Sequence, residues 1–165
     1  MAAIDLDNRA GSVYKVGNRL NGTSTKEASM PDKVKDWMSS PVVVVDADSS
    51  VSYALTLMRR RNIHSLVVVM TGENAPVYGI VTTTDIRDKI IIPERNPAET
   101  CVREVMTSPV VLGNPQWSLR ECSLKMQETG IHHMPVADEY GTLVGIISVT
   151  DIFRAAEEIG WGVAR

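Results

Sequence analysis

The sequence GIISVTDI at residues 145–152 closely repeats the sequence GIVTTTDI at residues 79–86. In each copy an apolar run rich in β-branched residues leads to a hydroxyl residue, and an aspartate follows three positions later. This pattern predicts a buried strand that runs directly into the first turn of a helix. A side-chain hydroxyl, a carboxylate and free backbone N–H groups would then meet at one strand-to-helix corner, and the chain would contain that corner twice.

The repeated corner has two interpretations. As a ligand site, the carboxylates of Asp85 and Asp151 would accept hydrogen bonds from a ribose diol, and the start of the helix would favour a phosphate. As a plain capping motif, Thr82 with Asp85 and Ser148 with Asp151 would bond only their own backbone. Repetition alone shows a repeated fold rather than a ligand, so the pattern leaves both interpretations open.

Composition and charge limit the classes of function. Of the 165 residues, 44% are hydrophobic and 22% are charged, which is typical of a soluble globular protein with an aliphatic core. The net charge of −3 provides no basic field, so nucleic acid and anionic lipid are disfavoured as partners. No apolar run approaches the roughly 20 residues that span a bilayer, and the N-terminus lacks an apolar signal segment. We therefore expect a cytoplasmic protein in which Cys101 and Cys122 are reduced thiols.

Two repeats follow an N-terminal extension. Residues 1–30 are rich in glycine, asparagine and hydroxyl residues, so we expect a flexible or loosely docked extension without chemistry of its own. The first repeat covers residues 31–95 and the second covers residues 96–165. VKDWMSSPVV at 34–43 matches VREVMTSPVV at 102–111, and NIHSLVV at 62–68 matches GIHHMPV at 130–136.

Apolar periodicity places the same elements in both repeats. Val51, Ala54 and Met58 lie at i, i+3 and i+7, which predicts one buried helix face. For the first repeat we predict a strand at 42–45, a helix at 49–61, strands at 65–70 and 77–82, and a helix at 84–90. For the second we predict a strand at 109–112, a helix at 117–129, strands at 133–137 and 143–147, and a helix at 150–158. The fold class is therefore α/β (α+β), with two β-α-β-β-α units that share their apolar sheet faces because each is too small to be stable alone.

The order of these motifs resembles a tandem cystathionine-β-synthase (CBS) domain pair, also called a Bateman module, over roughly residues 32–160. MSSPV at 38–42, MTSPV at 106–110, IHHMPV at 131–136 and the two corners carry the resemblance together. It implies that the two repeats pack around a pseudo-twofold axis. It also implies two clefts between them that bind adenosine-containing ligands.

The resemblance implies a role for each candidate site residue. Asp85 and Asp151 would hold the ribose hydroxyls, and ribose or phosphate would contact Thr82, Thr84, Ser148 and Thr150. Adenine would lie against Pro41, Val42, Pro109, Val110, Ile63 and Ile131. Phosphate-contacting positions of some relatives, such as the AMP-activated kinase regulatory subunit, match His64, His132 and His133. Positive charge near the anion would come from Arg87 and Arg154.

Two further features have competing interpretations. His132 and His133 are adjacent on a predicted strand, where neighbouring side chains point to opposite faces, so we predict no metal site. Arg59, Arg60 and Arg61 end a predicted helix, where they either form a solvated cap or border a cleft and meet a phosphate or partner. The first repeat has Ser65 and Val67 where the second has His133 and Pro135. Its cleft is therefore expected to differ in affinity or ligand.

Catalysis is poorly supported by the sequence, which lacks a nucleophile elbow and a phosphate loop. We predict a stand-alone regulatory sensor, not an enzyme, that needs no obligatory cofactor and binds AMP, ADP or ATP. It would signal through a homodimer or through a regulated enzyme or transporter. The alternative is a dimeric scaffold whose clefts are vestigial.

Overall fold

The computed structural model describes residues 33–72 and 76–160. The extension predicted for residues 1–30 lies outside these residues. The elements of the first half are α1 (Val34–Trp37), β1 (Val44–Asp46), α2 (Val51–Arg61), β2 (Ser65–Met70), β3 (Val77–Thr82), α3 (Thr83–Ile86) and the π-helix η1 (Arg87–Ile91). Those of the second half are the 3-10 helix η2 (Val102–Glu104), α4 (Leu119–Thr129), β4 (His133–Ala137), β5 (Leu143–Ser148) and α5 (Val149–Ile159).

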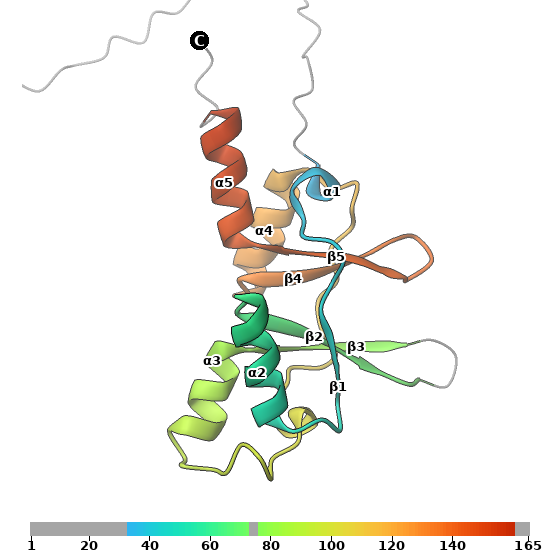
Figure 1. The fold of residues 1–165 in the computed structure, drawn as a ribbon. Coiled ribbons are helices and arrows are strands. Elements are labelled where there is room, and N and C mark those ends of the chain that lie inside the picture. The colour runs from blue at the N-terminus through green and yellow to red at the C-terminus, as the bar shows by residue number, and fades with distance from the viewer. Residues whose placement is uncertain (1–32, 73–75, 161–165) are drawn as a thin grey trace, which may run out of the picture.

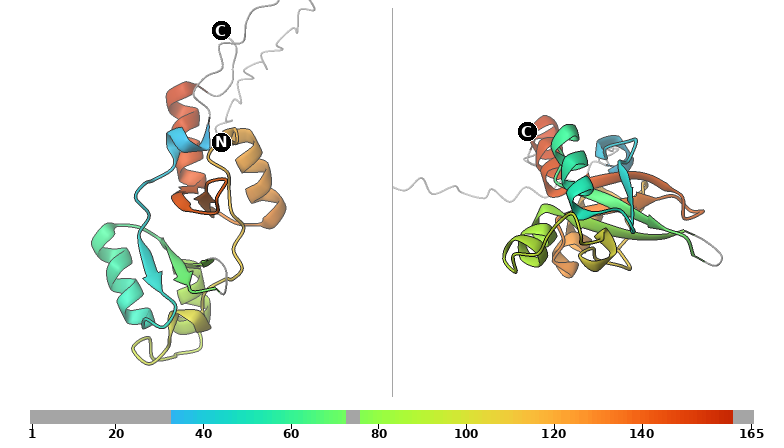
Figure 2. Two further views of the ribbon diagram at one scale, coloured as in Figure 1. Left: turned by 90° about the vertical axis from the view of Figure 1, so that its right-hand side faces the viewer. Right: turned by 60° about the horizontal axis from the view of Figure 1, so that its bottom comes forward.

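Two small sheets stacked one above the other form the centre of the molecule (Figures 1 and 2). In the first, β2 pairs parallel with β1 and antiparallel with β3. In the second, β4 pairs antiparallel with β5. The corresponding residues Val67 and Pro135 lie opposite Ile80 and Ile146 in their sheets. The predicted α+β fold with two similar halves is therefore confirmed.

The helices α2 and α4 begin and end in the same way because similar residues cap their ends. The side chains of Ser50 and Ser118 accept hydrogen bonds from backbone N–H groups of the first turn of α2 and α4. Each of these serines precedes the first helical residue, so the helices begin two residues later than predicted. The residue that follows each helix, Asn62 after α2 and Gly130 after α4, has a left-handed backbone conformation. The predicted buried face of α2 is confirmed at Val51, Ala54 and Met58.

The strand predicted at 109–112 is wrong. In the first half, the N–H of Val67 donates to the carbonyl of Val43 and helps to join β1 to β2. The corresponding residue in the second half is Pro135, which has no N–H to donate. The segment before α4 therefore pairs with β4 only through a single bridge, between Gly113 and Val136. The other predicted strands occur within two residues of their expected bounds.

The N-terminal segment of each repeat packs on the core of the other repeat. Val34 of α1 is fully buried in the cluster that contains Met134 and Ile147 of the second half. In the matching way, Val102 and Val105 belong to the cluster of the first half. This reciprocal exchange agrees with the pseudo-twofold packing expected for the pair.

The exchange makes residues 38–43 a crossing segment between the halves. Ser39 pairs with Ile146 of β5, whereas the chain five residues further on enters β1 of the other sheet. Figure 1 shows this segment descending from α1 to β1 along the side of both sheets. The corresponding segment of the second repeat crosses in the opposite sense, since Thr107 pairs with Ile80 of β3. Both crossing segments therefore lie at the junction of the halves.

Candidate functional site

Two clefts occur at this junction. The first, here called the Asp151 cleft, has a volume of about 290 Å³. Repeat one contributes its crossing segment and the loop that follows α2, and repeat two contributes the corner between β5 and α5. Its lining residues are Ser39, Pro41, Val42, Val43, Asn62, Ile63, His64, Ser65, His133, Ile146, Ser148, Thr150 and Asp151.

The second cleft, here called the Asp85 cleft, has a volume of about 410 Å³ and reverses the roles of the repeats. Repeat one now contributes the corner between β3 and α3, and repeat two contributes its crossing segment and the loop after α4. The lining residues are Ile80, Thr82, Thr83, Thr84, Asp85, Thr107, Pro109, Val110, Val111, Thr129, Gly130, Ile131, His132 and His133.

Each cleft therefore combines residues that the sequence assigned to different repeats. Asp151 faces Pro41 and Ile63, and Asp85 faces Pro109 and Ile131. The sequence comparison treated Ser65 as part of the first repeat's own cleft, but Ser65 lines the cleft that contains Asp151. The reason is the crossing of the N-terminal segments, which places the apolar residues of one repeat opposite the corner of the other.

The corner carboxylates cap their helices and also line the clefts. Oδ2 of Asp151 accepts hydrogen bonds from the N–H of Ser148 at 2.8 Å and from its hydroxyl at 2.7 Å. Oδ2 of Asp85 does the same with Thr82, at 2.9 Å and 2.6 Å. The capping interpretation is confirmed at both corners. It does not turn either aspartate away from its cleft.

The second carboxylate oxygen of each aspartate is paired with a cation on the same helical segment. Oδ1 of Asp85 accepts from Nζ of Lys89 at 3.0 Å, and Oδ1 of Asp151 accepts from the guanidinium of Arg154. The aspartate side chains are only 16% and 14% exposed, whereas the cations are 41% and 55% exposed. A ligand hydroxyl could therefore reach Oδ1 if the more exposed cation moved aside.

The predicted arginines are placed differently. Arg154 contacts Asp151 but is not among the residues that line the cleft. Arg87 instead forms an exposed ion pair with Asp88, which raises the pKa of Arg87 and lowers the pKa of Asp88 through their hydrogen bonds. The sequence reading missed Lys89, although its i, i+4 spacing from Asp85 is a recognised signal for a helical ion pair. Lys89 also donates to the carbonyl of Val105.

The three histidines of the chain all line the clefts. His64 lines the Asp151 cleft, His132 lines the Asp85 cleft, and His133 lines both. Burial lowers the pKa of His133, with smaller contributions in the same direction from His132 and His64, while Asp151 acts to raise it. The neutral imidazole is therefore favoured at the wall that the two clefts share.

Further polar residues of the clefts were not singled out from the sequence. Asn62 adds a polar group to the Asp151 cleft, and Thr83, Thr107 and Thr129 add hydroxyls to the Asp85 cleft. The repeat alignment could have identified them, because Asn62, Thr83 and Thr107 lie within its matched segments and Thr129 adjoins one. Among the residues that the structure describes, no group of three or more His, Cys, Asp or Glu side chains is arranged to hold a metal ion.

A third hollow of about 460 Å³ lies between α4 and α5 and shares Gly130, Ile131 and His132 with the Asp85 cleft. Its walls are largely apolar and include Met126, Ile131, Ile152 and the 54% exposed Phe153. Neither corner aspartate lines it. It is therefore a feature of the helical surface rather than a third copy of the cleft.

The family of the chain follows from the matching of its two halves. The model of the CBS domain matches residues 34–92 and again residues 102–158. The chain belongs to the CBS domain family. It is a tandem CBS pair, as the motif order indicated.

Known CBS proteins resemble the chain over most of this region. The CBS domain-containing protein YhcV of Bacillus subtilis is 33% identical over 119 residues, which cover 72% of this chain and 81% of that protein. For two further curated relatives, the matched region spans 48% and 53% of their length. The activities of such longer proteins therefore do not follow from the shared CBS pair.

Solved CBS structures share the fold. The hexameric CBS-CP12 protein from bloom-forming cyanobacteria superposes with a TM-score of 0.73 at 31% identity, over 81% of this chain and 75% of that one. The CBS domain pair of MJ0100, in complex with 5′-methylthioadenosine and S-adenosyl-L-methionine, superposes with a TM-score of 0.67 at 27% identity, over 77% and 97%. In the described part of the present chain, none of the helices has the length and apolar character needed to cross a membrane.

Proposed function

We propose that this CBS pair is a regulatory module that binds adenosine-containing ligands of the AMP, ADP or ATP class in its Asp151 and Asp85 clefts. One observation carries the proposal: in each cleft a carboxylate, a hydroxyl and a helix start from one repeat face an apolar segment from the other repeat. The module needs no obligatory cofactor and has no catalytic role of its own.

The chemistry of the Asp151 cleft matches such a ligand part by part. Pro41, Val42 and Ile63 form an apolar wall suited to a purine ring. The carboxylate of Asp151 suits the neighbouring hydroxyls of a ribose. The start of α5, an 11-residue helix, favours a phosphate through the helix dipole and the hydroxyl of Thr150, because the N–H groups of Val149 and Asp151 already donate to His132 and Ser148.

Signalling follows from the shared walls of the clefts. Because both repeats contribute to each cleft, a bound ligand contacts both halves at once. It stabilises whichever relative arrangement of the halves contacts it better, and the shift is limited by the difference in affinity between the arrangements. We propose that the shift is transmitted through a homodimer or to a regulated enzyme or transporter.

The complex of the MJ0100 pair with two adenosine compounds supports the ligand class, and the CBS-CP12 hexamer supports self-association as a property of related pairs. Relatives that carry enzyme names are longer than this chain. The L-aspartate semialdehyde sulfurtransferase of Methanocaldococcus jannaschii, for example, matches over only 22% of its length. This supports a regulatory rather than a catalytic role for the pair.

The proposal is tested by Asp151→Ala, with Glu121→Ala as its matched control. Glu121 forms the same kind of capping box with Ser118 on α4, but it does not line either cleft. Loss of a cap costs about 1 kcal/mol of unfolding free energy, so both variants should be similarly destabilised. Titration calorimetry with AMP and ATP should show that only Asp151→Ala loses most of the binding at the Asp151 cleft. Equal affinities in the two variants would contradict the role of Asp151.

A dimeric scaffold with vestigial clefts is the second candidate function. It is favoured by the ion pairs of Asp85 and Asp151, which already occupy both carboxylates within the chain. A thermal-shift screen separates the two candidates. A true ligand at 100 times its dissociation constant stabilises the fold by about 2.7 kcal/mol, whereas a scaffold would show no shift with AMP, ADP, ATP, S-adenosylmethionine or NAD.

A further inference from the structure

The two long helices end at equivalent positions with different charges. α2 ends with Arg59, Arg60 and Arg61, and the matching residues at the end of α4 are Gln127, Glu128 and Thr129. All six side chains are exposed. The local formal charge is therefore +3 at the end of α2 and −1 at the end of α4.

These helix ends lie at the mouths of the two clefts. Thr129, the last residue of α4, lines the Asp85 cleft together with Gly130. Arg61 is its counterpart, and it is followed directly by Asn62, which lines the Asp151 cleft. None of the three arginines lines the Asp151 cleft itself, but the run ends one residue before a residue that does, at the position that corresponds to Thr129.

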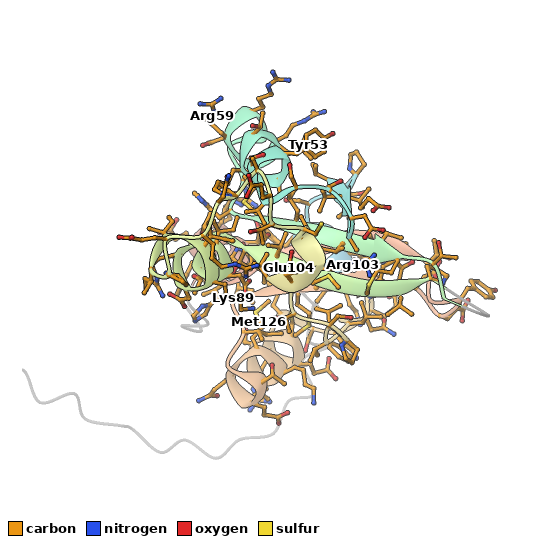
Figure 3. All side chains as sticks on the ribbon, turned by 90° about the horizontal axis from the view of Figure 1, so that it is seen from below. Tyr53, Arg59, Lys89, Arg103, Glu104 and Met126 are labelled. Carbon is orange, nitrogen blue, oxygen red and sulfur yellow. The ribbon has the colours of Figure 1, made fainter. Side chains whose placement is uncertain are left out.

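The arginines have no structural partner within the residues that the structure describes. The ion pairs of this part of the chain involve other side chains, and Figure 3 shows Arg59 extending outward from α2. Glu128 instead pairs with Lys125. The arginines therefore remain available for an anion from outside the chain.

Termination of the helix does not account for the arginine run. α4 ends with the same left-handed cap as α2 but has no basic residue in its last turn. Cations near a helix C-terminus are favourable but are evidently not required by this fold. The three positions can therefore differ between the repeats without altering how the helices end.

Other charges near the clefts are balanced between them. Each corner aspartate is paired with one cation, Lys89 for Asp85 and Arg154 for Asp151. Each cleft contains one histidine of its own, and both share His133. The helix ends are therefore the feature that distinguishes the clefts in charge.

We propose that the two clefts are selective for different ligand charges, and that Arg59, Arg60 and Arg61 determine the difference. The Asp151 cleft takes a nucleoside di- or triphosphate, whose outer phosphates extend to the arginines at its mouth. The Asp85 cleft takes an adenosine compound with at most one phosphate. The inference rests on the proposed function, because it assigns a ligand class to each of the same two clefts.

The test exchanges the helix ends between the repeats. In the Asp85→Ala background, which leaves the Asp151 cleft, calorimetry should show ATP binding about tenfold more tightly than AMP at low salt, since three exposed ion pairs are individually weak but act together. Replacing the run by its counterpart, R59Q/R60E/R61T, should bring the ATP-to-AMP affinity ratio close to one while AMP binding stays within about twofold. High salt should reduce the ratio only in the chain that retains the arginines.

The reciprocal exchange is the control. In the Asp151→Ala background, Q127R/E128R should improve ATP binding at the Asp85 cleft several-fold and leave AMP binding little changed, with Thr129 kept because it lines that cleft. The exchanged positions are exposed, and circular dichroism and thermal unfolding verify that each variant is folded. An unchanged ATP-to-AMP ratio in both exchanges would overturn the charge assignment while leaving the proposed function intact. Failure of the unaltered chain to bind either nucleotide would overturn both.

Discussion

At the scale of single residues, the corner aspartates show that a carboxylate can cap a helix and also line a cleft. In Asp151, Oδ2 is held by the N–H and hydroxyl of Ser148, and Oδ1 meets the more exposed Arg154. The cap fixes the orientation of the carboxylate, whereas its ion-pair partner Arg154 is 55% exposed. An orientation fixed before binding reduces the entropy that a ligand must overcome.

His133 leads to a prediction about stability and pH. Its pKa in the folded chain is lowered from the ordinary value of 6.5, so the unfolded chain binds the proton more tightly. The free energy of unfolding should therefore fall as the pH is lowered through about 6.5, until both states are protonated. Urea unfolding at a series of pH values should show this loss, and it should be smaller in His133→Gln.

Titratable and charged groups near His133 also influence its pKa and therefore this measurement. His132 and His64 act with burial to lower its pKa, and Asp151 opposes them. Asp85 shares the second cleft with His133 and is neutralised by Lys89. A phosphate in either cleft should weaken the pH dependence, because an anion favours the protonated imidazole. An identical pH profile in His133→Gln would refute the assignment.

At the scale of elements, the crossing segments hold the halves together through close contacts. Met38, at the start of the first crossing segment, lies directly over Gly145 of β5. A Cβ atom built on Gly145 would overlap the end of the Met38 side chain. The glycine therefore gives Met38 its position over β5, and any larger residue there requires the flexible Met38 side chain to move.

Gly145→Ala should lower the unfolding free energy by about 1–3 kcal/mol, because the Met38 side chain must leave its position. Adding Met38→Ala should relieve the overlap, so the two changes together should cost less than their sum in urea unfolding. Gly130→Ala is the matched control. It has a positive φ of 67° but no atom within 4 Å of its added Cβ. Its cost of about 1 kcal/mol is one of backbone conformation, and Met38→Ala should not relieve it.

At the scale of the whole molecule, the sequence repeats and the packed halves are not the same units. The core of the second half is completed by Val34, Trp37 and Met38 from the start of the chain. The core of the first half is completed by Val102 and Val105 from the second repeat. Each repeat therefore leaves a gap in its own core when it is separated from the other.

A fragment of residues 96–165 should consequently not fold on its own. It lacks the fully buried Val34 and the partly buried residues that pack beside it, in a unit too small to tolerate the loss. Circular dichroism during urea titration should show a gradual change rather than the cooperative transition of the full chain. A sharp transition of the fragment with ordered near-ultraviolet signals would contradict the interdependence of the halves.

Local patterns explain which parts of the fold were predictable. The bounds of β2 and β3 and the buried face of α2 follow from side-chain periodicity and turn residues within a few positions. The strand predicted at 109–112 failed because its pairing depends on a distant residue, Pro135, that cannot donate a hydrogen bond. Periodicity in a short segment does not report whether its partner strand can pair with it.

The sequence by itself determined the repeat, the helices and strands, and the residues at the two corners, because capping and periodicity act between residues close in the chain. Only the tertiary structure decided that Asp151 faces Pro41 and that His133 belongs to both clefts. These relations depend on contacts such as the pairing of Ser39 with Ile146, which joins segments far apart in the chain. Such contacts are set by how the two halves exchange their N-terminal segments, and no local pattern encodes that exchange.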